Sequence, residues 1–236
     1  MQIMTDSPIR FPGLFGDWAF TASSKAMDIG NGIYWYGILI ALGLVIAIWW
    51  CMNQKSKYGI TEDDLLDSVL WGIPCAIVGA RIYYVLFYLD QFKNSDGSFS
   101  FRKAIAIWDG GLAIYGGIIG GVLTAIVYSR VKKKNFWVMA DTMAPSLILG
   151  QMLGRWGNFF NKEAFGGFTD NLFAMRYQLS QVRASDVTPD ILQNLVTVNG
   201  VDYIQVHPTF LYESMWSLCV FLSLIHISEP TRRTPI

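Results

Sequence analysis

Residues 33–50 read IYWYGILIALGLVIAIWW, and this stretch decides the fold. It lies inside a longer window, residues 29–54, that contains no charged side chain. A helix needs about 20 mostly apolar residues to cross the hydrocarbon core of a bilayer. A buried helix of a soluble protein would show a polar stripe every three or four residues, and this window has none. The sequence therefore predicts a membrane-spanning helix here and disfavours the alternative, a soluble helical protein.

Four further stretches share this apolar character. Residues 110–129 carry no charged side chain. One charged side chain lies in each of the windows 68–89, 136–154 and 209–227. These are Arg81, Asp141 near the start of its window, and Glu213 in the first turn or two of the last window. We therefore expect five transmembrane helices and predict an all-α polytopic membrane protein. The predicted helices cover residues 32–52, 66–89, 109–130, 137–157 and 208–227.

The composition agrees with this class. Of the 236 residues, 53% are hydrophobic and 15% are charged, whereas a soluble domain has about 25% charged residues. The 18 basic side chains balance 18 acidic ones, so the sequence gives no case for nucleic-acid binding. The three cysteines form no CxxC pair and predict neither a disulfide framework nor a zinc site.

Lysine and arginine are unevenly distributed among the short loops. Two loops hold six of them, and such loops face the cytoplasm under the positive-inside rule. We therefore expect the N-terminus, the loop 90–108 and the polar segment 158–207 on the outer side of the membrane. The six residues are Lys55, Lys57, Arg130, Lys132, Lys133 and Lys134.

Two segments are too polar to span. The first is expected to be an N-terminal arm and the second a small extracytoplasmic head domain. Within the head, residues 172–178 and 201–206 alternate in polarity, which predicts short strands around an Asn199-Gly200 turn. The predicted order is 1–28 for the arm, 29–157 for helices one to four, 158–207 for the head and 208–221 for the start of the fifth helix.

Arg81 and a glycine-rich run are unusual inside apolar stretches. An ionisable residue within a span is costly, so Arg81 is expected either to pair with a carboxylate such as Asp109 or Glu213, or to bind a ligand. Residues 110–121 read GGLAIYGGIIGG. Their GxxxG spacing predicts close helix packing, and Gly110-Gly111 also suggests backbone exposed to a lipid head group. Tyr115 would lie just inside, with its hydroxyl available.

A third cluster lies at the end of the fourth predicted helix, where residues 154–167 read GRWGNFFNKEAFGG. Arg155 and Asn158 are three residues apart and share one helix face, and Glu163 follows where the helix should have ended. A planar fixed cation suits a phosphate, which it can bind with two hydrogen bonds. An arginine that merely reaches to the head groups needs no asparagine and glutamate beside it, so we favour a binding site. His207, which opens the fifth stretch, is either a surface residue or a proton acceptor.

These motifs, taken in chain order, resemble those of bacterial prolipoprotein diacylglyceryl transferases. The two most specific are the run from Gly154 and the heptapeptide from His207. The motifs are YWYG at 34–37, GARIYYVLFY at 79–88, WDGGLAIYGGIIGG at 108–121, GRWGNFFNKEAFG at 154–166 and HPTFLYE at 207–213.

The resemblance implies a reaction in the bacterial plasma membrane. A diacylglyceryl group passes from phosphatidylglycerol to the lipobox cysteine thiol of a preprolipoprotein, with no metal or cofactor. The thiolate is the nucleophile, and a fixed cation would stabilise the departing phosphate. The rival functions are a transporter or channel, which should show internal repeats that we do not find, and a non-catalytic lipid-binding membrane protein.

The resemblance also implies site residues. Arg155 is the expected phosphatidylglycerol-binding arginine, and Tyr115 stands where many family members have histidine. A tyrosine is a poor base, because its ordinary pKa is about 10, so we expect Tyr115 to orient the head group or the thiol. The expected catalytic residues are Tyr36, Tyr115, Asn158, Glu163 and His207, and the expected lipid-binding residues are Arg155, Arg81 and Gly166.

The end of the chain departs from the family. Residues 222–236 read LSLIHISEPTRRTPI and resemble the translation of a sequencing-library adapter. The family has seven spans, so we expect a truncated chain that carries a non-native tail over 222–236. Such a chain would lack two helices and part of the active site, and it need not be active.

Overall fold

The computed structural model describes residues 8–16, 18–29, 32–94 and 96–228. The chain divides into two compact units, which are described separately below. Unit 1 contains residues 1–47 and 145–236, and unit 2 contains residues 48–144. The boundary between them falls inside two long helices, α2 (Trp35–Tyr58) and α6 (Phe136–Asn161). Residues 229–236, in the predicted non-native tail, lie outside the described residues.

The five predicted apolar stretches all form helices. Besides α2 and α6 these are α3 (Glu62–Phe87), α5 (Ile114–Val131) and α8 (Thr209–Ser228). Four of them are long and apolar enough to cross a membrane. The helix α6 is long enough but is not among these four, since it carries several polar residues.

The chain is predominantly helical, as predicted, but all-α is too narrow a class, because unit 1 also contains a five-stranded sheet. The strand order is β2-β1-β5-β7-β6, and every neighbouring pair is antiparallel. The predicted Asn199-Gly200 turn joins β6 to β7, and both residues have positive φ, as a two-residue hairpin turn requires. The strands are β1 (Pro8–Arg10), β2 (Ala19–Thr21), β5 (Met175–Gln178), β6 (Val196–Val198) and β7 (Val201–Val206).

Two described parts of the N-terminal segment, residues 8–10 and 19–21, therefore belong to this sheet. The strand β1 pairs with β5, and Ile9 is completely buried. Two shorter strands, β3 (Lys25–Met27) and β4 (Ile33–Tyr34), form a separate pair that leads into α2. Short helices complete the unit: α1 (Pro12–Phe15), α7 (Pro189–Gln193) and the 3-10 turns η3 (Leu179–Gln181) and η4 (Ala184–Asp186).

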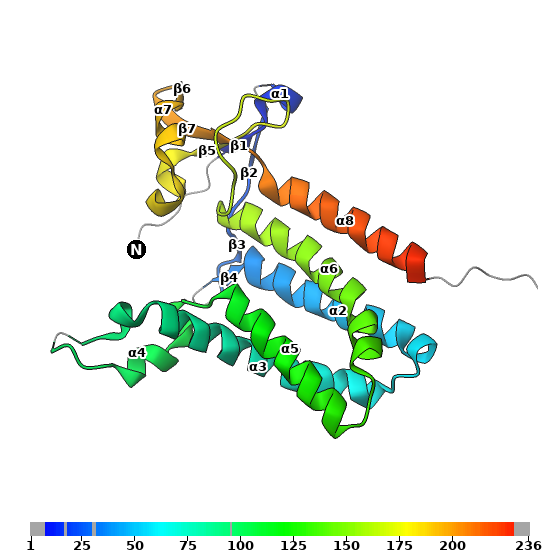
Figure 1. Ribbon diagram of the computed structural model, residues 1–236. Coiled ribbons are helices and arrows are strands. Elements are labelled where there is room, and N and C mark those ends of the chain that lie inside the picture. The colour runs from blue at the N-terminus through cyan, green and yellow to red at the C-terminus, as the bar shows by residue number, and fades with distance from the viewer. Residues whose placement is uncertain (1–7, 17, 30–31, 95, 229–236) are drawn as a thin grey trace, which may run out of the picture. The chain divides into compact units, whose positions relative to one another are not determined.

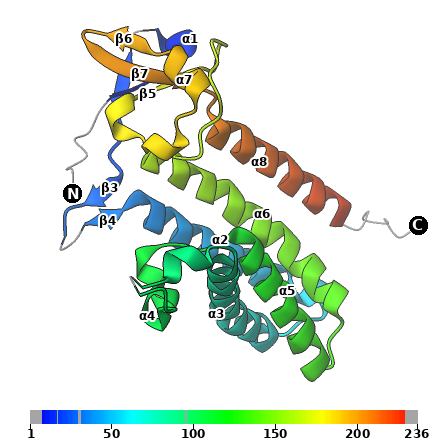
Figure 2. The same ribbon diagram turned by 60° about the vertical axis from the view of Figure 1, so that its left-hand side comes forward.

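One face of the sheet forms the core of unit 1. Residues alternate along a strand between the two faces, and on β5 and β7 the inward residues include Tyr177 and Ile204. They pack with Phe159, from the end of α6, and Phe210, from the start of α8. Figures 1 and 2 show α6 and α8 side by side, with the sheet at one end of them. The sheet thereby fixes the ends of both helices.

Tyr177 ties the sheet to α6. Its hydroxyl donates a hydrogen bond to the backbone oxygen of Phe159 at 3.2 Å. Burial raises the pKa of Tyr177, since the charged form would be desolvated. The hydroxyl therefore keeps its proton and remains a donor.

In unit 2 the helices α3 and α5 form a tightly packed pair. A methyl group at Gly120 would fall 2.5 Å from the Cys75 oxygen, and one at Gly79 would fall 2.5 Å from the Gly116 oxygen. Such distances exclude any residue larger than glycine without a backbone shift. The predicted packing role of the GxxxG pair is thus correct for Gly116 and Gly120, whereas a methyl group at Gly121 would meet open space.

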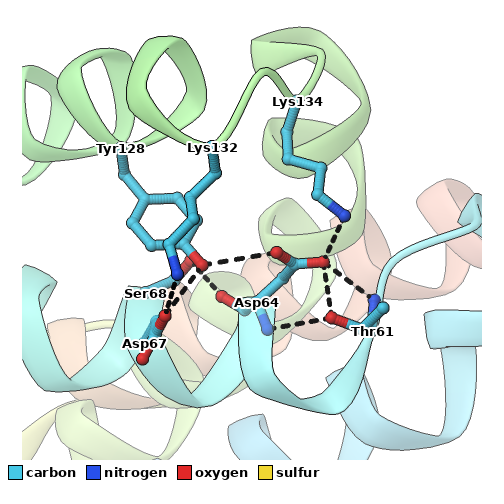
Figure 3. Close-up of polar contacts among 7 residues, drawn as sticks. All are labelled: Thr61, Asp64, Asp67, Ser68, Tyr128, Lys132 and Lys134. Carbon is cyan, nitrogen blue, oxygen red and sulfur yellow. Dashed lines mark hydrogen bonds and ion pairs between the residues drawn. The ribbon is translucent and has the colours of Figure 1, made fainter.

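Polar side chains join the other end of this helix pair (Figure 3). The buried carboxylate of Asp64 accepts a hydrogen bond from Lys134 Nζ at 2.7 Å and caps its own helix together with Thr61. The hydroxyl of Tyr128 lies between Asp64 and Asp67, at 3.3 and 3.2 Å. We call the group drawn in Figure 3 the Asp64 cluster; its members are Thr61, Asp64, Asp67, Ser68, Tyr128, Lys132 and Lys134.

Candidate functional site

The end of α6 carries the motif at 154–166, and the helix stops there for a local reason. It ends at Asn161, and Lys162 and Ala164 both have positive φ, which breaks the helical path. Glu163 therefore lies outside the helix, as predicted. Its backbone N–H still donates to the Asn158 oxygen at 3.1 Å, so the turn keeps Glu163 close to the helix end.

Asn158 and Glu163 line one pocket of about 440 Å³. One carboxylate oxygen of Glu163 accepts a hydrogen bond from Asn161 at 3.2 Å, and the other pairs with Arg183 at 3.1 Å. The Glu163 side chain is 18% exposed, whereas that of Arg183 is 67% exposed. The lining residues are Asn158, Glu163, Ala164, Phe165, Arg183 and Asp186. The arrangement presents an amide, a carboxylate and an exposed cation around one pocket.

Arg183 and Asp186 are residues that the sequence reasoning missed. They lie about η4 in the head, some twenty positions beyond Glu163, and belong to no repeating pattern. The sequence offered one signal for Arg183: it is one of only three basic residues in the segment 158–207.

Arg155 lies one turn before Asn158 on α6. Its guanidinium forms an ion pair with the carboxylate of Glu213, on α8. The next residue, Trp156, donates its indole N–H to Ser214 at 3.1 Å. Two neighbouring polar contacts thus hold α6 against α8 at the level of Arg155. Glu213, which the sequence offered as a partner for Arg81, pairs with Arg155.

Gly166 and His207 are joined through their backbones. The Gly166 N–H donates to the His207 oxygen at 3.1 Å, and the His207 N–H donates to the Gly167 oxygen at 3.1 Å. A methyl group at Gly166 would fall 2.8 Å from the His207 Cβ. The imidazole Nδ1 lies 3.4 Å from the Tyr212 hydroxyl and 3.5 Å from the Asn171 amide. Gly166 therefore fixes the backbone that carries the histidine.

Tyr36 lies in the first turn of α2. A methyl group at Gly157 would fall 2.6 Å from the Tyr36 ring, so the glycine allows the ring to lie directly on α6. Tyr36 is 38% exposed. Unit 1 therefore holds six of the eight predicted site residues: Tyr36, Arg155, Asn158, Glu163, Gly166 and His207.

The other two, Arg81 and Tyr115, belong to unit 2. Tyr115 is the second residue of α5 and is 67% exposed, with its ring 6.3 Å from that of Tyr83. Arg81 is only 7% exposed and lies near the end of α3, not in its middle, because the helix starts earlier than predicted.

All five N–H groups of Arg81 donate to backbone oxygens. No donor is left for a lipid phosphate, which argues against the predicted contact with phosphatidylglycerol. The side chain of Asp109, the other carboxylate offered as a partner, is outside the described residues. The acceptors are the oxygens of Lys103, Ala104, Ala106, Gly110 and Gly111.

Comparison with known proteins gives a consistent result. A family model described as prolipoprotein diacylglyceryl transferase matches residues 24–235. A protein of Oceanobacillus iheyensis is 47% identical over 201 residues, and one of Listeria monocytogenes is 42% identical over 212 residues. A third, from Bacillus velezensis, is 42% identical over 193 residues. All three bear the name phosphatidylglycerol–prolipoprotein diacylglyceryl transferase.

The matches cover most of this chain but less of the relatives. They span 85% of the chain and 65% of the Oceanobacillus protein, and 89% of the chain and 69% of the Listeria protein. For the Bacillus protein the shares are 82% and 65%. The chain thus spans about two thirds of the length of these relatives.

Proposed function

Because this chain belongs to the prolipoprotein diacylglyceryl transferase family, we propose that it transfers the diacylglyceryl group of phosphatidylglycerol to the lipobox cysteine of a preprolipoprotein. A carbon–sulfur bond forms at the glyceryl carbon, the carbon–oxygen bond to the phosphate breaks, and glycerol phosphate leaves. The observation that carries this proposal is the arrangement at the end of α6, where Arg155, on one helix face with Asn158, lies a turn before the pocket.

Arg155 is the group we assign to the lipid phosphate. Its ion pair with Glu213 involves one terminal nitrogen, and the two side chains are 29% and 42% exposed. Partial exposure weakens such a pair through solvent screening. A phosphate can therefore compete with the carboxylate and bind the planar guanidinium with two hydrogen bonds. The same charge would stabilise the phosphate as it departs.

The polar pocket beside it is the place we assign to the reacting groups. The thiol has to lose its proton to become a nucleophile. Among the predicted site residues of unit 1, Glu163 and His207 are the ones whose side chains we propose as acceptors of this proton. Asn158, which lines the pocket, can hydrogen-bond the glycerol hydroxyls, and Tyr36 can do the same from α2. Tyr115 is proposed to orient the head group or the thiol.

The proposed reaction places the chain in the bacterial plasma membrane. The four apolar helices support a membrane location, and α6 is proposed as a fifth span. The lysine-rich loop after α5 supports an orientation with that loop in the cytoplasm and with the sheet of unit 1 outside. This side is where phosphatidylglycerol of the outer leaflet and an exported lipobox peptide would both be available.

A transfer assay tests the proposal. The chain is reconstituted in vesicles that contain radiolabelled phosphatidylglycerol and is given a lipobox peptide, with the Listeria relative as the positive control. We expect label on the peptide thiol, and none on a peptide whose cysteine is replaced by serine. A chain that binds the lipid but leaves the peptide unlabelled would instead support a non-catalytic lipid-binding protein.

A further inference from the structure

Arg81 is the centre of the connection between α3 and α5, residues 88–113. Its Nε donates to the Ala104 oxygen at 2.8 Å, and its Nη2 donates to the oxygens of Lys103 and Ala106 at 2.7 and 3.0 Å. These three oxygens belong to the last turn of α4 (Phe101–Ile105) and the residue after it. Helix ends leave such oxygens without partners inside the helix. Arg81 therefore supplies the donors that this short helix lacks.

The remaining nitrogen, Nη1, holds the turn that precedes α5. It donates to the oxygens of Gly110 and, at 2.8 Å, Gly111. Both glycines have positive φ, 86° and 78°, which lets their carbonyl groups turn toward the arginine. A methyl group at Gly111 would fall 2.7 Å from Nη1 itself and 2.6 Å from the Tyr84 ring. The guanidinium thus fills the space that a larger residue at position 111 would need.

Aromatic rings close the sides of this arrangement. The guanidinium carbon lies 5.1 Å from the centre of the Phe92 ring and 5.9 Å from that of Tyr84. Such contacts add cation–π attraction and exclude water. Arg81 makes five hydrogen bonds and is 7% exposed, so turning toward a ligand would require it to break these bonds.

The connection in turn determines where α5 begins. The Ala113 N–H, just before the helix, donates to the Ala80 oxygen at 3.1 Å, and Gly116 packs directly on α3. Tyr115 lies between these two anchors along the chain, and its side chain is 67% exposed, with its ring 6.3 Å from that of Tyr83 on α3. The position of the Tyr115 side chain therefore depends on the backbone path of residues 110–113, which the hydrogen bonds from Arg81 hold in place.

We propose that Arg81 is a positioning residue for Tyr115 and does not bind the lipid phosphate. Through Gly110 and Gly111 it fixes the first turn of α5, and so the place of the Tyr115 hydroxyl. This inference rests on the proposed function for the role of Tyr115, but the arrangement around Arg81 can be tested without it.

Two variants disturb the arrangement from opposite sides. Arg81→Gln removes most of the donors, and Gly111→Ala places a methyl group against Nη1 while the charge stays. Arg102→Gln removes an exposed arginine of the same connection, and Gly97→Ala changes a glycine with the same positive φ whose added methyl group would meet open space. These two are the matched controls.

Hydrogen exchange of the full chain in vesicles is the first measurement. We expect the amides of residues 103–113 to exchange about tenfold faster in Arg81→Gln and Gly111→Ala, because local opening becomes easier, and unchanged exchange in the two controls. Unchanged exchange in Arg81→Gln would overturn the proposal, whether or not the chain shows transfer activity. An inactive wild-type chain would therefore count against the proposed function alone.

Kinetics supply the second measurement. A positioning role predicts that both variants lower kcat about tenfold while KM for phosphatidylglycerol stays within about twofold. In a Tyr115→Phe background, Arg81→Gln should cause almost no further fall in kcat, because Arg81 is proposed to act only by positioning the Tyr115 hydroxyl. A large rise in KM with normal kcat, or losses that multiply in the double variant, would show instead that Arg81 acts on the lipid independently of Tyr115.

Discussion

The guanidinium of Arg155 on α6 pairs with the carboxylate of Glu213 on α8, so the cation assigned to the lipid already has an anionic partner. The pair has a simple physical reason. A bare arginine at the edge of an apolar region is unfavourable, and the carboxylate compensates its charge. If Arg155 binds the lipid phosphate as proposed, Glu213 competes with the lipid for the same guanidinium group.

Replacing Arg155 should abolish transfer. Arg155→Ala leaves the phosphate without a fixed cation and leaves Glu213 unpaired, and we expect a fall of at least about 100-fold in kcat/KM in the vesicle assay. Arg155→Lys keeps the charge but not the planar pair of donors, so it should recover only part of this loss. Unchanged labelling in Arg155→Ala would remove the assignment.

Glu213→Gln supplies the opposite test of the same pair. It frees Arg155 from its competitor, so the KM for phosphatidylglycerol should fall by about two- to fivefold, consistent with the small free energy of a partly exposed ion pair. Thermal unfolding should shift slightly downward, because α6 and α8 lose one contact. A KM that rises would mean that Glu213 itself contacts the substrate.

Gly166 should tolerate no side chain, in contrast to its neighbour. Gly166→Ala brings a methyl group 2.8 Å from the His207 Cβ and 3.2 Å from a Thr209 methyl carbon, whereas at Gly167 the added group meets open space. We expect Gly166→Ala to lower kcat/KM about tenfold or more by displacing His207, and Gly167→Ala to stay within about twofold. Equal effects of the two substitutions would contradict this explanation.

The sequence predicted the five long helices well, but several of their ends differ from the prediction: α2 and α6 end six and four positions later than expected, and two starts are displaced as well. The helix α3 begins at Glu62, four positions before the predicted start, because Thr61 and Asp64 form a capping box. That box is visible in the sequence as T-x-x-D. The helix α5 begins at Ile114, five positions after the predicted start, because Gly110 and Gly111 have positive φ. Apolar composition alone predicts neither of these two helix starts.

Long-range contacts could not be predicted from one sequence. The pairing of β1 with β5 joins residues far apart along the chain, and short strands carry too weak a pattern to identify their partners. The motif residues around Asn158 and Glu163 were identified from their spacing, whereas Arg183 has no such signal. For Arg81 the sequence showed a charged residue inside an apolar stretch, which is uncommon. It could not show the partners of Arg81, because they are backbone oxygens, and every residue has one.

Tyr115→Phe tests the residue that replaces the histidine of many family members. If its hydroxyl orients the head group or the thiol, its removal should lower kcat about tenfold and leave the fold unchanged, because the ring is 67% exposed. The transfer assay measures the loss, and hydrogen exchange of α5 checks the fold. Tyr83→Phe is the control and should keep full activity. Tyr83 lies on α3, and its ring is 6.3 Å from that of Tyr115. Full activity of Tyr115→Phe would exclude the proposed role.

The Asp64 cluster should contribute to stability without contributing to transfer. The Asp64 side chain is 7% exposed and its partner Lys134 is 34% exposed, whereas Asp67 and Lys132 are 33% and 49% exposed. Removing the partner of a buried charge costs more free energy than removing the partner of an exposed one. Lys134→Ala should therefore lower the free energy of unfolding in detergent much more than Lys132→Ala. Adding Asp64→Asn to Lys134→Ala should recover part of the loss, since a neutral amide needs no cation to balance it. Equal losses in the two lysine variants, or no recovery in the double variant, would mean that burial of Asp64 does not determine the stability of this end of the helix pair.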